Sequence, residues 1–247
     1  MKVITTFSPK GGSGRTTTVL ALACGFLEQG KKVSVMECTD HAGSVPRTQC
    51  PSTVLDWVLD MQKTSINRIA LTYLPCRTGQ QVADCIALAR IEGFDILLID
   101  TQSTIERAQL EAIRGADLIL APASGPFEAR FILQGIDKYI DKPQDVVGVV
   151  TNRSDDQAAA RRTRAAFGTH PAFKSELPCA DVLANQIETG GIAQRVAKLA
   201  CNPTDAGFGA YRDALAAWVA VQQLASEVQW ALDGQRLQTY DADDHCA

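Results

Sequence analysis

The sequence predicts a doubly wound α/β fold, in which helices flank a mostly parallel sheet. Three short segments, 96–101, 116–122 and 146–150, are apolar on both faces. Strands buried from both sides have this pattern, which is typical of parallel sheets. Helical stretches at about 104–114 and 127–140 lie between these strands. Strands that alternate with helices in this way favour the doubly wound arrangement.

The N-terminal segment begins this sheet with a βαβ unit. Residues 2–7 are short and rich in β-formers, which indicates a buried strand. A glycine-rich loop follows, and apolar residues then recur at helical spacing up to Gly30, a natural helix stop. Residues 32–38 are the second predicted strand. A strand, a glycine loop, a helix and a second strand in this order make one βαβ unit.

The rest of the chain is predicted to be mostly helical. Residues 52–90 are expected to form helices and connectors, and after residue 155 only a short strand near 173–177 interrupts the helices. A long helix over 211–232 is expected to pack its apolar face on the sheet. A membrane-surface helix is the alternative, which the acidic flank at 241–244 opposes because such helices favour Lys and Arg. The apolar face comprises Leu215, Trp218, Val219, Leu224, Val228 and Leu232.

The organisation of the chain is predicted to be simple. No internal repeat or low-complexity linker divides it, so we expect one domain over 1–235 and a flexible acidic tail over 236–247. The longest apolar runs are too short to span a bilayer. The N-terminus has no leader pattern, because the glycine-rich loop begins within about ten residues of it. These features predict a cytoplasmic protein without membrane insertion.

Charge and cysteine content exclude some classes of function. The formal net charge is −4 and the pI is about 5.4, which argues against a surface coated in positive charge for nucleic acid. A local basic patch remains compatible with this balance. The eight cysteines form no C-x-x-C pair and have no His at metal-ligand spacing, so we expect them to behave as small buried hydrophobes.

The glycine-rich loop has the chemistry of a phosphate site. Its glycines let the backbone turn tightly and approach a phosphate, and its amides lie at the start of a helix whose dipole favours anions. A hydroxyl at Thr16 suits Mg²⁺, and a cation at Arg15 would neutralise phosphate charge. A glycine-rich turn without a ligand is the alternative. The predicted phosphate-binding residues are Lys10, Gly11, Gly12, Ser13, Gly14, Arg15, Thr16 and Thr17.

This loop resembles the deviant Walker A motif of the ParA/MinD family, with two departures from the general P-loop pattern. Pro9 stands in place of the first glycine, and Arg15 stands in place of the usual lysine. The resemblance implies a P-loop NTPase fold of the SIMIBI type, with ATP and Mg²⁺ as cofactors. It also implies that Lys10 is the family's signature lysine, a catalytic residue that reaches across an ATP-sandwich dimer to the partner's nucleotide.

Further segments extend the resemblance along the chain. Residues 96–101 look like the Walker B strand, which implies that Asp100 is catalytic and acts on Mg²⁺ through water. Asn152 follows a strand that resembles the one supplying an adenine-contacting Asn, although Asn is also common as a turn residue at strand ends. The loop at 177–184, which contains Pro178, resembles the segment that closes over the base.

The second strand departs from the family pattern of two acids. Glu37 preserves the first acid. In the family the second acid helps to position the attacking water, but here Thr39 occupies its position and has no carboxylate. Asp40 follows one residue later, on the opposite face of a continuing strand, although a loop conformation would let it act as the catalytic acid. Arg and Lys are not interchangeable at a tight phosphate site. Arg15 and Thr39 therefore predict slow hydrolysis with nucleotide binding retained.

The resemblance implies a switch that positions or segregates DNA, as plasmid-partition and conjugative or T-DNA-transfer proteins do. The expected partners are a second copy of the chain, nonspecific DNA on the nucleoid, and a ParB-like or relaxosome-type protein. Candidate DNA contacts are Arg161, Arg162 and Arg164, the densest basic cluster, which can equally be a solvated helix face.

Two other functions remain open at this point. A hydrolysis-impaired scaffold that recruits a protein partner in secretion or polar positioning is favoured by Arg15 and Thr39. A metabolic P-loop enzyme related to dethiobiotin synthetase shares the predicted fold. A MinD-type membrane role is disfavoured because no basic amphipathic C-terminal helix is evident.

Overall fold

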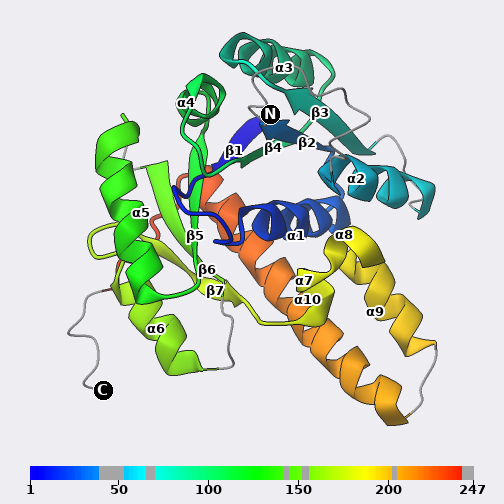
Figure 1. Cartoon of the computed structure of the whole chain (residues 1–247). Coiled ribbons are helices and arrows are strands. Elements are labelled where there is room, and N and C mark those ends of the chain that lie inside the picture. Colours follow the sequence, from blue (N-terminus) through cyan, green and yellow to red (C-terminus); the bar gives the residue numbers. More distant parts are fainter. Residues whose placement is uncertain (39–52, 65–69, 142–144, 152–155, 202–204, 241–247) are drawn as a thin grey trace.

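A parallel sheet of seven strands forms the centre of the described chain, in the order β3-β2-β4-β1-β5-β6-β7 (Figure 1). The computed structural model describes residues 1–38, 53–64, 70–141, 145–151, 156–201 and 205–240. All the strand pairs are parallel. The strands are β1 Lys2–Thr6, β2 Val33–Cys38, β3 Leu71–Cys76, β4 Ile96–Thr101, β5 Leu118–Ala123, β6 Val146–Thr151 and β7 Ala172–Leu177.

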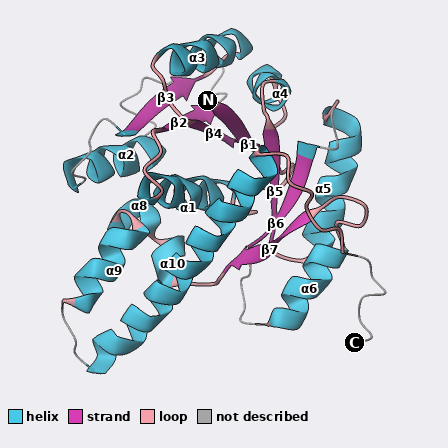
Figure 2. Cartoon of the chain, turned by 180° about the vertical axis from the view of Figure 1, so that it is seen from behind, coloured by secondary structure: helices cyan, strands magenta, loops and turns pink. Residues whose placement is uncertain are grey.

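Helices cover both faces of this sheet (Figure 2). One layer holds α1 (Arg15–Glu28), α2 (Thr53–Thr64) and α10 (Asp205–Leu232), and the other holds α3 (Gly79–Ile91), α4 (Arg107–Arg114), α5 (Pro126–Tyr139) and α6 (Gln157–Ala165). Three shorter helices lie between β7 and α10 in the chain. They are α7 Asp181–Ala184, α8 Gln186–Thr189 and α9 Ile192–Ala200.

The strands are apolar on both faces because each face contacts a different helical layer. Along β4, Ile96 and Leu98 belong to the core beneath α1, whereas Leu97 and Ile99 belong to the core beneath α3 and α4. This alternation confirms the doubly wound sheet predicted from the apolar runs. The arrangement is the fold of P-loop NTPases.

The C-terminal helix packs on the sheet as predicted, but its buried face differs from the predicted one. It crosses close to α1, where a Cβ on Gly25 would lie only 2.7 Å from the Ala225 Cβ. Leu224, Val228 and Leu232 are buried as expected. Leu215 and Val219 are exposed instead, because the small residues Ala214 and Ala217 occupy the close contacts with the core.

One further expectation differs from the structure. Residues 52–90 contain the strand β3, whereas only helices and connectors were predicted there. This edge strand is half-buried along its middle and includes Pro75, so it lacks a continuous apolar run. After α10, the Gln238 carbonyl accepts the Ala172 N–H of β7 at 3.2 Å. None of the described helices has the length and apolarity needed to cross a bilayer.

Candidate functional site

The glycine-rich loop lies between the carboxyl end of β1 and the first turn of α1. Gly12 and Gly14 have φ values of 75° and 92°, in the left-handed region that favours glycine. Gly14 immediately precedes the helix and supplies no side chain to cap it. The first amides of α1 are therefore available to an anion, and the helix dipole favours negative charge at the same place. The loop therefore has a backbone geometry suited to an anion.

Thr16 and Asp100 meet at the centre of the site. Asp100 is the penultimate residue of β4, and the Thr16 hydroxyl donates a hydrogen bond of 2.6 Å to its Oδ2. Asp100 is only 6% exposed, and its Oδ1 has no hydrogen-bond partner within the described part of the chain. A hydroxyl beside a buried carboxylate with an unbonded oxygen is the oxygen donor set that Mg²⁺ prefers. The residues present therefore fit a magnesium ion.

Burial also affects the acidity of this carboxyl group. It raises the pKa of Asp100 from 3.8 to about 6, and the neighbouring Glu37 adds to the rise. The hydrogen bond from Thr16 and the positive charge of Arg15 oppose the shift. Keeping Asp100 ionised at neutral pH therefore costs stability when no cation is bound.

Arg15 folds back over the loop that precedes it. Its Nη1 donates to the carbonyl oxygens of Ser8 and Lys10, the second at 3.2 Å. Burial lowers the pKa of the guanidinium, and the charges of Asp100 and Glu128 oppose this shift. The planar group is thus accommodated within the loop by two backbone carbonyl acceptors.

Lys10 lies beside a buried acid that the sequence did not single out. Its Nζ is 3.5 Å from Oε1 of Glu128 in the first turn of α5. The Lys10 side chain is 49% exposed, whereas that of Glu128 is 3% exposed. The only sequence signal for Glu128 was an acidic residue just after Gly125 and Pro126. Such a residue usually does no more than favour a helix start.

A cavity of about 380 Å³ continues from the loop toward the end of β7. This volume is in the range of small-molecule sites. Thr151, at the end of β6, closes one wall, and its hydroxyl donates to the Ser13 carbonyl at 3.2 Å. The remaining walls are the loop and helix residues 12–17 and the segments 177–181 and 183–184, so Thr17 and Pro178 both line the cavity.

Other predicted site residues fall in different places. Thr39, Asp40 and Asn152 lie outside the described residues. Glu37 pairs in register with Asp100 across β2 and β4, and its Oε2 accepts the Tyr73 hydroxyl at 2.7 Å. The first acid of the second strand therefore lies beside Asp100.

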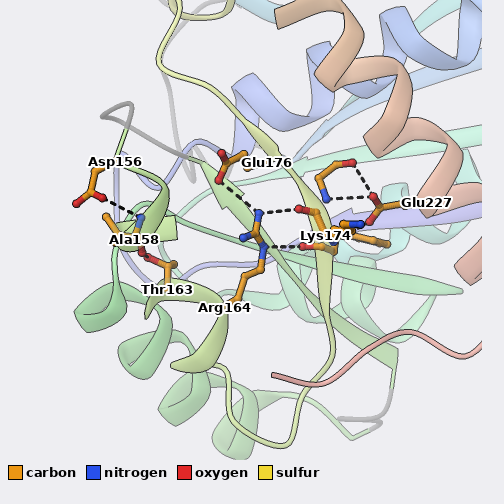
Figure 3. Close-up of polar contacts among 10 residues, drawn as sticks. Asp156, Ala158, Thr163, Arg164, Lys174, Glu176 and Glu227 are labelled. Atoms are coloured by element: carbon orange, nitrogen blue, oxygen red, sulfur yellow. Dashed lines mark hydrogen bonds and ion pairs between the residues drawn. The ribbon is translucent and has the colours of Figure 1, made fainter. Parts of the chain in front are cut away.

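The three arginines do not form one exposed cluster, because Arg164 is bonded to the segment that contains Lys174 and Glu176 (Figure 3). Arg161 and Arg162 are exposed on α6, and Arg162 pairs with Asp156 at 3.4 Å. Arg164 is instead 11% exposed, and its Nη2 lies 2.6 Å from the Lys174 carbonyl and 3.4 Å from Glu176. Its guanidinium thus satisfies the backbone of β7 and is not available to an external phosphate.

Comparison with known proteins supports the fold. No family model matches the sequence, and no curated protein sequence matches it. Among solved structures, the chain is similar to the MinD cell division protein of Aquifex aeolicus. The two share 17% identity with a TM-score of 0.62, covering 96% of this chain and 99% of the other.

Two more solved structures share this architecture. Cobyrinic acid a,c-diamide synthase from Mycobacterium smegmatis, bound to an ATP analog and magnesium, has 15% identity, a TM-score of 0.57 and coverage of 97% and 99%. A putative plasmid partition protein from Borrelia burgdorferi, bound to AMPPNP, has 14% identity, a TM-score of 0.56 and coverage of 88% and 98%. At these identities the likeness establishes the fold.

The buried carboxylate gives a testable effect on stability. Because the folded-state pKa of Asp100 is about 6 against 3.8 unfolded, its contribution to stability falls as pH rises through this window. Asp100→Asn should therefore raise the unfolding free energy of the ligand-free protein at pH 7.5, by about 1–3 kcal/mol, and change it little at pH 4. Urea denaturation at both pH values checks this. Asp137→Asn, at an exposed acid on α5, is the control. An unchanged or lower stability at pH 7.5 would contradict the expectation.

The loop glycines give a second prediction. At Gly14, with φ +92°, a Cβ would lie 3.0 Å from Thr151 Cγ2, whereas a Cβ on Gly11 meets nothing within 4 Å. Gly14→Ala should lower the unfolding free energy by about 1–3 kcal/mol, because the residue is strained in both backbone and contacts. Gly11→Ala should leave stability nearly unchanged. Chemical denaturation compares the two variants, and equal losses would show that Gly14 has no special conformational role.

Proposed function

We propose that the chain is a ParA-like ATP-binding switch that dimerises with ATP, hydrolyses it slowly, and positions or segregates DNA. The contact between Thr16 and Asp100 beside the loop glycines is the observation that carries this proposal. Thr16, Asp100 and the first amides of α1 would hold Mg²⁺ and the phosphates. When bound, Mg²⁺ neutralises phosphate charge and orients the terminal phosphoryl group.

The cavity beside the loop supports a nucleotide rather than a free phosphate. It is large enough for a base and a sugar, and its lining includes both the start of α1 and the segment with Pro178. The solved structures with a similar fold include proteins bound to an ATP analog with magnesium and to AMPPNP. ATP and Mg²⁺ are therefore the cofactors that we propose for this chain.

Dimerisation is proposed from the position of Lys10. Its side chain is half exposed at the entrance to the loop, where a second copy can contact it. The helix α5, which carries Glu128, also exposes Phe127 and Phe131, at 73% and 39%. Two large apolar side chains exposed on the helix that contacts Lys10 suit a surface that a second copy covers.

A scaffold with little hydrolysis is the second candidate, and one observation favours it. The Arg15 guanidinium is hydrogen-bonded to the Ser8 and Lys10 carbonyls. It must therefore break these hydrogen bonds before it can pair with a phosphate. A group that must reorganise contributes less to a transition state than a preorganised one. Steady-state ATP turnover of the wild type and of Arg15→Lys separates the two candidates. A switch that relies on hydrolysis shows ATP turnover in the wild type, whereas a scaffold with little hydrolysis does not.

Nucleotide binding is expected to depend on magnesium through Thr16. Isothermal titration of the wild type should show Mg²⁺-dependent ATP binding, with ADP as a second ligand and GTP as a specificity control. Thr16→Ala should reduce the Mg²⁺-dependent gain in ATP affinity by at least about tenfold, because the variant lacks a predicted metal ligand. Thr18→Ala, which removes a buried hydroxyl bonded to the Gly14 carbonyl and lies outside the cavity lining, is the matched control. No ATP binding by the wild type would overturn the proposal.

DNA binding is expected to use the exposed pair Arg161 and Arg162. Changing both to Glu should reduce ATP-dependent retention of nonspecific duplex DNA by tenfold or more at low salt, because phosphate contacts dominate such binding. Arg164 is kept in place because it supports β7. Arg90→Glu combined with Lys198→Glu, at exposed positions on α3 and α9, makes the same change in net charge and is the control. Filter binding with ATP and with ADP measures the effect. A wild type that never retains DNA with ATP excludes DNA as the partner.

A further inference from the structure

Glu128 is a buried carboxylate held in one orientation. Its Oε2 accepts two hydrogen bonds from Ser124, one from the backbone N–H at 2.8 Å and one from the hydroxyl at 2.6 Å. These contacts leave Oε1 buried and without a hydrogen-bond partner among the described residues. The Nζ of Lys10 lies 3.5 Å from this second oxygen. One oxygen is therefore fixed by the backbone after β5, and the other is directed at the loop cation.

A second contact fixes α5 against the loop. A Cβ on Gly135 would lie 2.9 Å from the Phe7 ring and 3.3 Å from Pro9 Cγ. The absence of a side chain at Gly135 thus lets the helix approach the start of the loop closely. Because Pro9 immediately precedes Lys10, the backbone that carries the lysine has a defined position relative to Glu128.

We infer that Glu128 is a positioning residue. It keeps Lys10 paired within its own chain until the lysine moves to a second copy of the chain. This inference rests on the proposed function, in which Lys10 reaches the nucleotide of the partner. When Lys10 leaves, the Glu128 carboxylate stays buried without its main cation, which is unfavourable. The pairing therefore opposes dimer formation and raises the protein concentration at which the ATP-bound dimer assembles.

The pairing itself is tested without nucleotide. A double-mutant cycle of Lys10→Gln and Glu128→Gln measures the equilibrium constant for unfolding in urea. We expect the two changes to be coupled by about three- to tenfold, as for a close ion pair with one buried member. A cycle with Glu111→Gln, a partly exposed acid on α4 that pairs with Arg114, in place of Glu128→Gln should show no coupling to Lys10. Coupling below about 1.5-fold for the Lys10–Glu128 pair would overturn the inference.

The consequence for assembly is tested by analytical ultracentrifugation with ATP and Mg²⁺. Glu128→Gln should lower the concentration at half-dimerisation by about fivefold, because Lys10 no longer has to leave a buried carboxylate. In the Lys10→Gln background the same change should have no effect on dimerisation. A purely structural role of Glu128 would move the midpoint equally in both backgrounds, and weaker dimerisation of Glu128→Gln would also contradict the inference.

The two readouts separate failure of the inference from failure of the proposed function. A wild type that stays monomeric with ATP at all concentrations rejects the dimerisation switch. The unfolding cycle still decides in that case whether Glu128 pairs with Lys10. Coupling in the cycle together with a fivefold shift in the dimer midpoint supports both.

Discussion

The parallel pairing of β1 with β4 is the constraint on which the rest of the site depends. The register places Thr5 opposite Ile99, so both strands end at the same edge of the sheet. The loop after β1 and the carboxylate at the end of β4 therefore meet, although they are far apart in the sequence. The 2.6 Å contact between Thr16 and Asp100 follows from this alignment and from the immediate start of α1 after Gly14. An antiparallel pairing would place the same two side chains at opposite ends of the sheet.

The loop combines two cations with two buried acids. Lys10 lies beside Glu128, and the negative charges of Asp100 and Glu128 both act on Arg15. The ligand-free loop therefore does not concentrate uncompensated positive charge at the helix start. An entering anion has to draw the cations away from these acids, and a divalent cation relieves the cost of the ionised Asp100. Charge balance in the site thus changes in a coordinated way when anion and metal enter together.

Local patterns predicted most of the fold, and the misses have physical causes. Apolar runs indicated β4, β5 and β6 because both faces of these strands are buried. The edge strand β3 lacks such a run, since its middle residues are half-buried and Pro75 interrupts the pattern. Within the site, the glycine loop and Asp100 were predictable from short motifs. Glu128 was not, because its contact with Lys10 arises only when the sheet places α5 beside the loop.

The arginines of α6 show the same limit. Their proximity in the sequence suggested one basic cluster, but successive helical residues point in different directions. Arg164 faces β7, where the irregular pairing with β6 leaves backbone carbonyls to be satisfied. Arg161 and Arg162 face away from it. A sequence pattern reports which charges are present, whereas the packing of the helix decides which of them reach solvent.

The outer edge of β7 has a consequence for how copies of the chain can associate. Glu227 of α10 accepts the backbone N–H groups of Lys174 and Ser175, and the Ala172 N–H is bonded to Gln238. Figure 3 shows Arg164 bonded to the carbonyls on the same segment. Backbone groups that an added strand would use are thus already bonded within the chain. The sheet cannot be extended into a continuous ladder at this edge, so contacts between copies there would have to involve side chains.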